Sequence, residues 1–106
     1  MFPVIYEITA SVRNDLTDAF EEFLTNTHIP DLMTTGAFTE AKFTRSTPGR
    51  YRIVYEARSR EALDSYLKEH ARGLRKHMTE TFPNGVELSR EEWTLLKRFD
   101  GSEYQK

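Results

Sequence analysis

The sequence has no cysteine among its 106 residues. Disulfide frameworks, thiolate nucleophiles and Cys-ligated zinc or iron–sulfur sites are therefore excluded, and we predict a cytoplasmic location. Its 5 Gly are scattered as turn residues, so the chain has neither a Gly-rich phosphate-binding loop nor a dinucleotide fingerprint. We predict no flavin, nicotinamide or other cofactor. The serines lack a strained elbow motif, so no hydrolase triad is predicted.

Long hydrophobic runs and a surplus of positive charge are also missing. An acidic side chain, Glu7, appears within a few residues of Met1, so we expect neither a signal peptide nor a membrane span. The formal net charge of -2 provides no broad positive field, and we predict no nucleic-acid partner. What is present, 38% hydrophobic and 30% charged residues, is typical of one globular domain with a real core.

Four segments have the alternating pattern of half-buried strands. In the last of them the apolar positions change parity, from Val86 and Leu88 to Trp93 and Leu95. One extra residue in a strand reverses its faces, so this pattern predicts a β-bulge near Glu91. The predicted strands are residues 4–12, 38–45, 51–57 and 86–96, with a hairpin turn at residues 46–49.

Two helical segments separate these strands, and both are predicted to be broken. The first is interrupted at Pro30, because proline disfavours helical geometry at the preceding residue, Ile29. The second begins at Ser59, a good N-cap residue. It is interrupted between His70 and Gly73. Each half of the chain thus pairs one strand with a broken helix.

The order of these elements predicts an α+β, ferredoxin-like βαββαβ fold. Such a fold has a four-stranded antiparallel sheet with both helices on one face. We predict residues 1–99 as a single domain and residues 100–106 as a polar C-terminal tail. Right-handed crossovers place the first and third strands side by side. We expect these two strands to run parallel, which would bring His28 and His70 together at one edge of the sheet.

The sheet face away from the helices is predicted to be too apolar for water. A mixed patch of this kind is typical of an interface, so we expect a homodimer with facing sheets, a dimeric α/β barrel. The patch is predicted to contain Ile5, Ala41, Phe43, Val54, Trp93 and Leu95 among the polar residues Glu7, Thr9, Arg52 and Glu56.

A short pattern occurs twice: Tyr-Glu in a strand, then an aromatic-Leu pair and a His in the following helix. It singles out His28, His70, Tyr6 and Tyr55 as the candidate lining of a ligand pocket, with no catalytic role assigned. Imidazole titrates near neutrality and exchanges protons. The same residues also have structural roles, because histidine caps helix ends and a central tyrosine is commonly core. Both interpretations remain open.

Three further kinds of site find little support in the sequence. A metal site is not predicted, because no compact histidine pair surrounds His28. His77 lies beside Arg72, Arg75 and Lys76, and this basic cluster forms either a solvated face or an attractor for a carboxylate or phosphate. RNA-recognition domains share the predicted strand order, but residues 49–55 do not match their aromatic pattern.

The chain resembles a small bacterial family described only as a domain of unknown function. The resemblance covers residues 4–99 and rests on YEIT at residues 6–9, HIPDLMTTGAF at 28–38, and YLKEHA at 66–71 followed by Leu74 and Arg75. This family is similar to the dimeric α/β-barrel superfamily, which includes antibiotic-biosynthesis-type monooxygenases, haem-degrading enzymes and EthD-like proteins. The resemblance implies the fold and the dimer but no substrate. Arg72 stands where the family often has proline.

The sequence therefore predicts a homodimeric α/β-barrel protein that binds a small molecule or acts as an interaction module. The alternative is a cofactor-independent monooxygenase- or isomerase-like enzyme with a pocket between sheet and helices. Whether the chain is an enzyme stays open, since no catalytic signature accompanies the fold.

Overall fold

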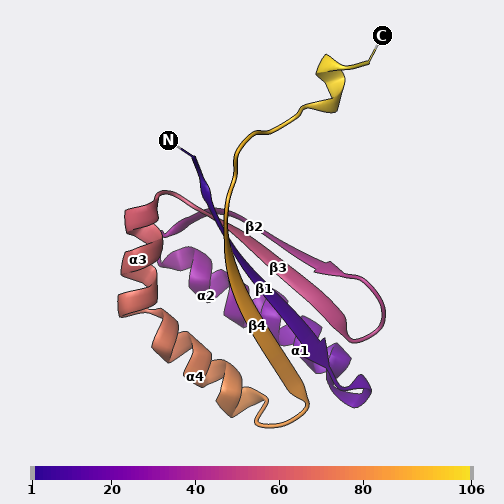
Figure 1. The fold of residues 1–106 in the computed structure, drawn as a ribbon. Helices are drawn as coiled ribbons and strands as arrows, with labels where there is room; N and C mark the ends of the chain where they lie inside the picture. Colours follow the sequence, from indigo (N-terminus) through magenta and orange to yellow (C-terminus); the bar gives the residue numbers. More distant parts are fainter. Residues whose placement is uncertain (1, 106) are drawn as a thin grey trace.

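The structure, a computed structural model, describes residues 2–105. Within this range one antiparallel sheet has the strand order β2-β3-β1-β4, and the helices cover one of its faces (Figure 1). The predicted ferredoxin-like α+β fold is confirmed. The strands are β1 (Val4–Val12), β2 (Phe38–Arg45), β3 (Arg50–Ala57) and β4 (Val86–Thr94).

The two central strands run in opposite directions. Tyr6 on β1 lies directly opposite Tyr55 on β3 in an antiparallel register. Our expectation of parallel central strands is wrong, because the β2–β3 hairpin reverses the chain before β3 forms. The two helical segments consequently run in opposite directions as well, which removes the argument that placed His28 and His70 at one edge.

A bulge near the start of β2 decides which of its side chains face the core. Phe38 pairs with Ala57, but the next pair joins Glu40 to Glu56, so Thr39 is an extra residue. The bulge turns the odd-numbered residues after it toward the helices. Ala41 and Phe43 therefore lie on the helix side, and their predicted place on the open face is wrong. Phe43 packs there against Phe20 and Tyr51, with ring centroids 6.3 and 5.5 Å away.

Strand β4, in contrast, pairs with β1 in one uninterrupted register, from Val12 opposite Val86 to Val4 opposite Thr94. The bulge predicted near Glu91 is not there. Arg90 therefore lies opposite Ile8, on the same face as the buried side chains of β1. Trp93 lies on the open face, where 48% of it is exposed.

The first helical segment bends without stopping. Its middle is a π-helical turn, in which the N–H of Ile29 donates to the carbonyl of Leu24, five residues earlier. Pro30, which has no N–H, follows directly. The predicted break is thus a change of helical pitch at His28. The segment consists of a 3-10 turn (Asn14–Leu16), α1 (Thr17–Phe23), the π-helical turn (Leu24–His28) and α2 (Ile29–Thr34).

The second helical segment is broken at His70, as predicted. His70 has φ -121° and ψ -34°, which separates α3 (Arg60–Glu69) from α4 (Ala71–Thr81). Ser59 caps α3, because its hydroxyl accepts a hydrogen bond from the N–H of Ala62 at 3.0 Å. Gly73 lies inside α4.

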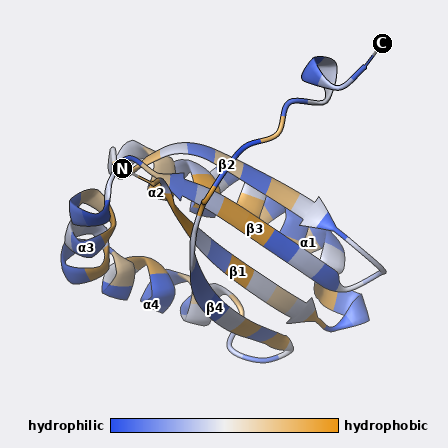
Figure 2. Cartoon of the chain, turned by 45° about the horizontal axis from the view of Figure 1, so that its top comes forward, coloured by the Kyte–Doolittle hydropathy of each residue, from blue (hydrophilic) through white to orange (hydrophobic). Residues whose placement is uncertain are grey.

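Aromatic side chains fill the space between the sheet and the helices. The rings of Tyr6, Phe38, Tyr55 and Tyr66 pack with centroids 5.0 to 6.2 Å apart. Apolar positions also alternate with polar ones along the strands (Figure 2). The core therefore lies on the helix side of the sheet. The β2–β3 turn closes against β1 at Gly49, where a Cβ would lie 2.6 Å from the Val12 carbonyl oxygen.

Beyond β4 the chain leaves the sheet. The N–H of Leu95 still donates to the carbonyl of Pro3, and the chain then extends away to a 3-10 turn, Gly101–Glu103 (Figure 1). This segment holds exposed apolar side chains, among them Phe99, which is 70% exposed. A domain boundary at residue 99 stays a prediction. Among residues 2–105 no helix is long and apolar enough to cross a membrane.

The inward position of Phe43 makes a testable prediction. Phe43→Ala should lower the free energy of unfolding by about 2 kcal/mol, because it removes a partly buried ring from the core. Lys42→Ala, on the neighbouring position of the other face, should change it by less than about 0.5 kcal/mol. Urea titrations measure both. A Phe43→Ala variant of normal stability would contradict the bulged register.

Candidate functional site

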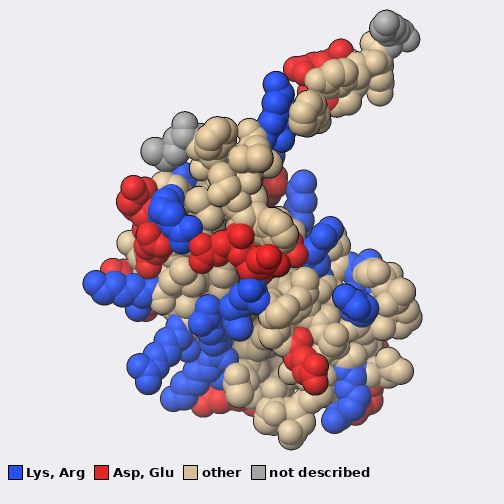
Figure 3. Space-filling model, viewed as in Figure 1, with Lys and Arg blue, Asp and Glu red and all other residues tan. Residues whose placement is uncertain are grey.

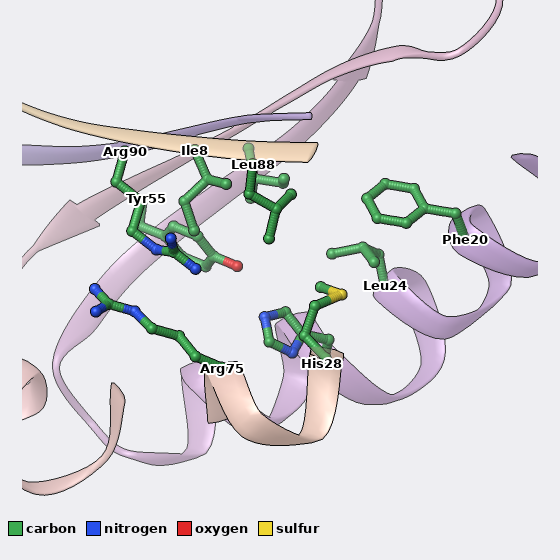
Figure 4. Close-up of a pocket in the computed structure, with 10 residues that line it drawn as sticks. Ile8, Phe20, Leu24, His28, Tyr55, Arg75, Leu88 and Arg90 are labelled. Carbon is green, nitrogen blue, oxygen red and sulfur yellow. The ribbon is translucent and has the colours of Figure 1, made fainter. Parts of the chain in front are cut away.

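A small cavity of about 10 Å³, room for about one water molecule, lies between the sheet and the helices. It is reached by side chains from β1, β3, β4, the first helical segment and α4 (Figure 4). Most of its lining is apolar, with four polar residues placed among the apolar ones. The apolar residues are Ile8, Phe20, Leu24, Ile53, Met78 and Leu88; the polar ones are His28, Tyr55, Arg75 and Arg90.

His28 enters this cavity from the π-helical turn. Its side chain is buried, with 6% exposed, and its Nδ1 has no hydrogen-bond partner in the protein. The pKa of His28 is lowered to about 4, chiefly by burial; Asp31 opposes this shift, while His77 and Arg90 add to it. At neutral pH the imidazole is therefore uncharged. It can accept a proton or a hydrogen bond from a bound molecule.

Tyr55 enters the same cavity from the central strand β3. It is fully buried, and its hydroxyl points into the cavity without a hydrogen-bond partner in the protein (Figure 4). Burial raises the pKa of Tyr55, so the hydroxyl stays protonated and can donate. Among residues 2–105, the Tyr55 hydroxyl and Nδ1 of His28 are the two buried side-chain polar atoms without a partner.

Two arginines border this cavity and also a second, more open hollow. Arg75 on α4 donates a hydrogen bond from Nη2 to the hydroxyl of Tyr6 at 3.1 Å. Tyr6 thus lines the outer hollow with Leu67, Glu91 and Glu92. Arg75 and Arg90 form the boundary that both spaces share.

The structure brings together three of the four predicted site residues. His28 and Tyr55 line the inner cavity and Tyr6 lines the outer hollow. His70 lines neither: it is exposed at the helix break, with its ring 6.3 Å from that of Tyr66. His28 is instead linked through Phe23 to His77, since the Phe23 ring lies 5.8 Å from His28 and 5.3 Å from His77.

The sequence patterns did not identify Arg90 as a residue of the pocket. Because we expected a bulge in β4, the face of the sheet on which the Arg90 side chain lies could not be assigned. The sequence identifies Arg75 as part of the basic cluster on α4 and of the family resemblance, without a place in the pocket. The uninterrupted alternation from Val86 through Leu88 to Arg90 was the signal that could have identified it.

A second polar cluster has a structural role. The carboxylate of Glu21 on α1 accepts hydrogen bonds from the Tyr51 hydroxyl at 2.6 Å and from Arg45 at 2.8 Å. These bonds lower the pKa of Glu21, and burial together with the Glu21 contact raises the pKa of Tyr51 to about 12. The cluster ties α1 to β2 and β3. Among residues 2–105, no group of three or more His, Asp or Glu residues could hold a metal ion.

Comparison with known sequences adds a family. A family model described as "Domain of unknown function (DUF4286)" matches residues 3–95. No curated protein matches the chain.

Solved structures share the fold at low identity. SnoaB, a cofactor-independent oxygenase from Streptomyces nogalater, superposes with a TM-score of 0.74 at 14% identity, covering 91% of this chain and 95% of that one. A putative antibiotic biosynthesis monooxygenase from Nitrosomonas europaea has a TM-score of 0.70 at 15% identity, with coverages of 89% and 99%. A dimeric ferredoxin-like protein from an uncultured marine organism has a TM-score of 0.68 at 13% identity, with coverages of 93% and 100%. At these identities the likeness shows the fold.

The buried state of His28 predicts a pH dependence of stability. Because the folded pKa is about 4, below the ordinary 6.5, the unfolded chain binds more protons between these values. The stability that the protein gains with this imidazole unprotonated is fully present above about pH 6.5 and is lost as pH falls toward 4. Between pH 7 and pH 5 wild type should lose about 2 kcal/mol of unfolding free energy more than His28→Gln.

Urea titrations at the two pH values measure this difference. His70→Gln is the matched control, since His70 is exposed, and it should keep the pH dependence of wild type. If His28→Gln also kept it, the buried neutral imidazole would be refuted.

Proposed function

Because this chain belongs to the DUF4286 family, whose description assigns no activity, we propose its function from its own site: a homodimer that binds a small molecule between sheet and helices. The observation that carries this proposal is that His28 and Tyr55 present unpartnered buried polar atoms to one cavity. Leaving such an atom without a hydrogen bond costs about 1–3 kcal/mol. A water molecule or one small group of a ligand that bonds to both atoms would offset that cost.

The lining of the cavity resembles that of a ligand site at the scale of one small group, and the cavity adjoins the outer hollow of about 550 Å³ at Arg75 and Arg90. Such sites are mostly apolar, with a few placed polar groups that fix the orientation of the ligand. Here the acceptor of His28 and the donor of Tyr55 lie inside, and Arg75 and Arg90 lie at the boundary (Figure 4). A molecule in the outer hollow would therefore meet Arg75 and Arg90 and place one small group in the cavity.

The dimer is proposed through the open face of the sheet. This face is less apolar than the sequence predicted, since Ala41 and Phe43 face the other way. The open face keeps Val54 and the cross-strand pair of Ile5 and Trp93. The face also mixes charges of both signs, including Glu7 and Arg52 in the central strands, and a two-fold axis would allow opposite charges to meet across the interface.

Two further observations support the second copy. The segment after β4 carries Leu96, Phe99 and Tyr104 into solvent instead of onto its own core, and Arg98 pairs with Glu56 of the open face. Solved structures with this fold include two described as dimeric ferredoxin-like proteins. If the open face binds a different protein instead, the chain is an interaction module.

The dimer predicts an effect of charge at the centre of the open face. Val54→Asp should convert the protein from a dimer to a monomer at micromolar concentration, because it buries a carboxylate against the second copy. Light scattering after size-exclusion chromatography measures the mass. Ser65→Asp, the same charge on the exposed face of α3, should leave the dimer intact. A wild-type monomer would contradict the proposal.

Cytoplasmic location also stays a proposal. It rests on the lack of cysteine in the sequence.

An enzyme is the second candidate function. Neutral His28 can take a proton while protonated Tyr55 stabilises the developing charge, and both face one cavity. This is the minimum needed for an isomerase-like proton transfer or for activating a substrate toward oxygen without a cofactor. SnoaB, a cofactor-independent oxygenase with the same fold, motivates the second reaction.

Binding and turnover are separated by one experiment. In a thermal-shift screen of small hydroxyaromatic and carboxylic compounds, we expect compounds that raise the Tm of wild type and lose most of that effect in the double variant His28→Gln/Tyr55→Phe. His70→Gln is the control and should respond like wild type. Each hit is then incubated in D2O and with oxygen: deuterium uptake or oxygen consumption favours the enzyme, while unchanged hits favour the binding protein. Hits that stabilise the double variant equally would contradict the site.

A further inference from the structure

We propose that the C-terminal arm, residues 95–105, binds the second copy of this chain, and that the arm's tip, residues 99–104, docks at the β2–β3 hairpin end of the partner's open face. This inference rests on the proposed dimer and names the contact that orients it. Each protomer would then hold the other with its arm.

The tip of the arm has local structure although it lies away from its own sheet. The Asp100 carboxylate accepts hydrogen bonds from the N–H of Ser102 at 3.0 Å and from its hydroxyl at 2.8 Å, which closes the 3-10 turn. The rings of Phe99 and Tyr104 lie 6.3 Å apart on this turn, and they are 70% and 62% exposed. The tip therefore presents a preformed aromatic pair, which a partner can bind at little cost in conformational entropy.

The arm begins at the end of the sheet opposite its own hairpin turn. The N–H of Leu95 donates to the carbonyl of Pro3 before β1, whereas the hairpin turn is bonded to the end of β1, where the N–H of Val12 donates to the carbonyl of Gly49 at 2.8 Å. The nine residues of β1 separate these ends by roughly 30 Å. The arm runs away from the sheet (Figure 1), and the radius of gyration, 15.1 Å, exceeds the value of about 13 Å for a compact domain of this length. The tip is therefore available to another molecule.

Charge on the open face changes sign along β2 and β3. Glu40 and Glu56 lie opposite each other at the end next to the arm, and Arg52 and Arg50 follow toward the hairpin turn. Glu87, at the level of Arg50, lies across the sheet on the edge strand β4. A two-fold axis parallel to the sheets and perpendicular to the strands would place the acidic end of each copy on the basic end of the other.

The arm has the same change of sign along its length. Lys97 and Arg98 lie at its base, and Arg98 pairs with Glu56 at the acidic end of its own open face. The tip carries Asp100 and Glu103, and Figure 3 shows basic atoms toward the base of the arm and acidic ones toward its tip. In the dimer described above, the hairpin end of the partner lies beside the base of the arm. The acidic tip therefore meets the basic end of the partner's open face.

An open hollow of about 730 Å³ at the hairpin end has room for the tip. Arg50 and Arg52 line it, and within residues 2–105 neither forms an ion pair with an acidic side chain. Arg45 also lines the hollow but is paired with Glu21, and Glu7 offsets part of the remaining positive charge. The other lining residues all carry hydroxyl groups. Guanidinium groups bind carboxylates and stack on aromatic rings, which are the two kinds of group that the tip presents.

The test uses the lack of cysteine, which allows one spin label to be attached at a chosen position. Unlabelled Gln105→Cys carrying a nitroxide is refolded from urea together with 15N-labelled wild type, and native mass spectrometry confirms the mixed dimer. The nitroxide can broaden 15N signals only across the interface. We expect the amide signals of residues 44–52 to lose most of their intensity. Ser65→Cys, which carries the label on the exposed side of α3, is the control and should leave these signals unchanged.

Removing the aromatic pair tests the same contact by affinity. In Phe99→Ser/Tyr104→Ser the dissociation constant of the dimer should rise on the order of tenfold or more, because each dimer loses two docked tips. Sedimentation equilibrium measures this constant. Lys76→Ser, which shortens an exposed side chain on α4, should dimerise like wild type.

The outcomes separate the arm from the dimer itself. A confirmed mixed dimer whose hairpin signals stay sharp overturns the docking of the tip and leaves the proposed dimer standing. The same conclusion follows if the double variant dimerises as tightly as wild type. Wild type that stays a monomer at micromolar concentration refutes the dimer, and the docking of the arm with it.

Discussion

The uninterrupted register between β1 and β4 is the constraint on which the site depends. Side chains alternate between the faces of a strand, so a slip of one residue would exchange every inward and outward position of β4. With Ile8 opposite Arg90, the arginine reaches the helix side next to the cavity. The same register places Glu92 where Arg60 can bind it. One backbone pairing thus positions a cation at the cavity and lets Arg60 pair with Glu92, which lines the outer hollow.

Two local irregularities complete the arrangement. The bulge after Phe38 turns Phe43 inward to close the core beside Phe20. The π-helical turn before Pro30 ends at His28 and carries its imidazole into the cavity. Bulges and π-helical turns interrupt regular hydrogen bonding and are frequent next to functional sites. The π-helical turn lines the cavity directly, whereas the bulge in β2 acts through Phe43, which packs against the cavity-lining Phe20.

The sequence predicted the elements better than their orientation. Proline chemistry located the irregularity at Pro30, cap chemistry located Ser59, and strand alternation placed Tyr6 and Tyr55 inside. The predicted orientation was wrong where apolar residues occupy an exposed face. Trp93 on the open side of β4 changes the parity of the apolar positions, and this change predicted a bulge that is not there. The repeated Tyr-Glu and His pattern likewise carries no direction, so it could not show that antiparallel strands would leave His70 outside the cavity.

The cost of the cavity argues that it has a function. A domain is stable by only about 5–15 kcal/mol, and two buried polar atoms left without any hydrogen bond would remove a substantial part of that margin. Apolar side chains at these positions would pack with Leu24 and Ile53 and avoid the cost. The lowered pKa of His28 shows the same tension, because burial and nearby cations keep the ring neutral at the expense of stability in acid. His28, Tyr55 and two arginines that form no ion pair with an acidic side chain among residues 2–105 surround this one space. Recognition of a bound molecule accounts for all of them together.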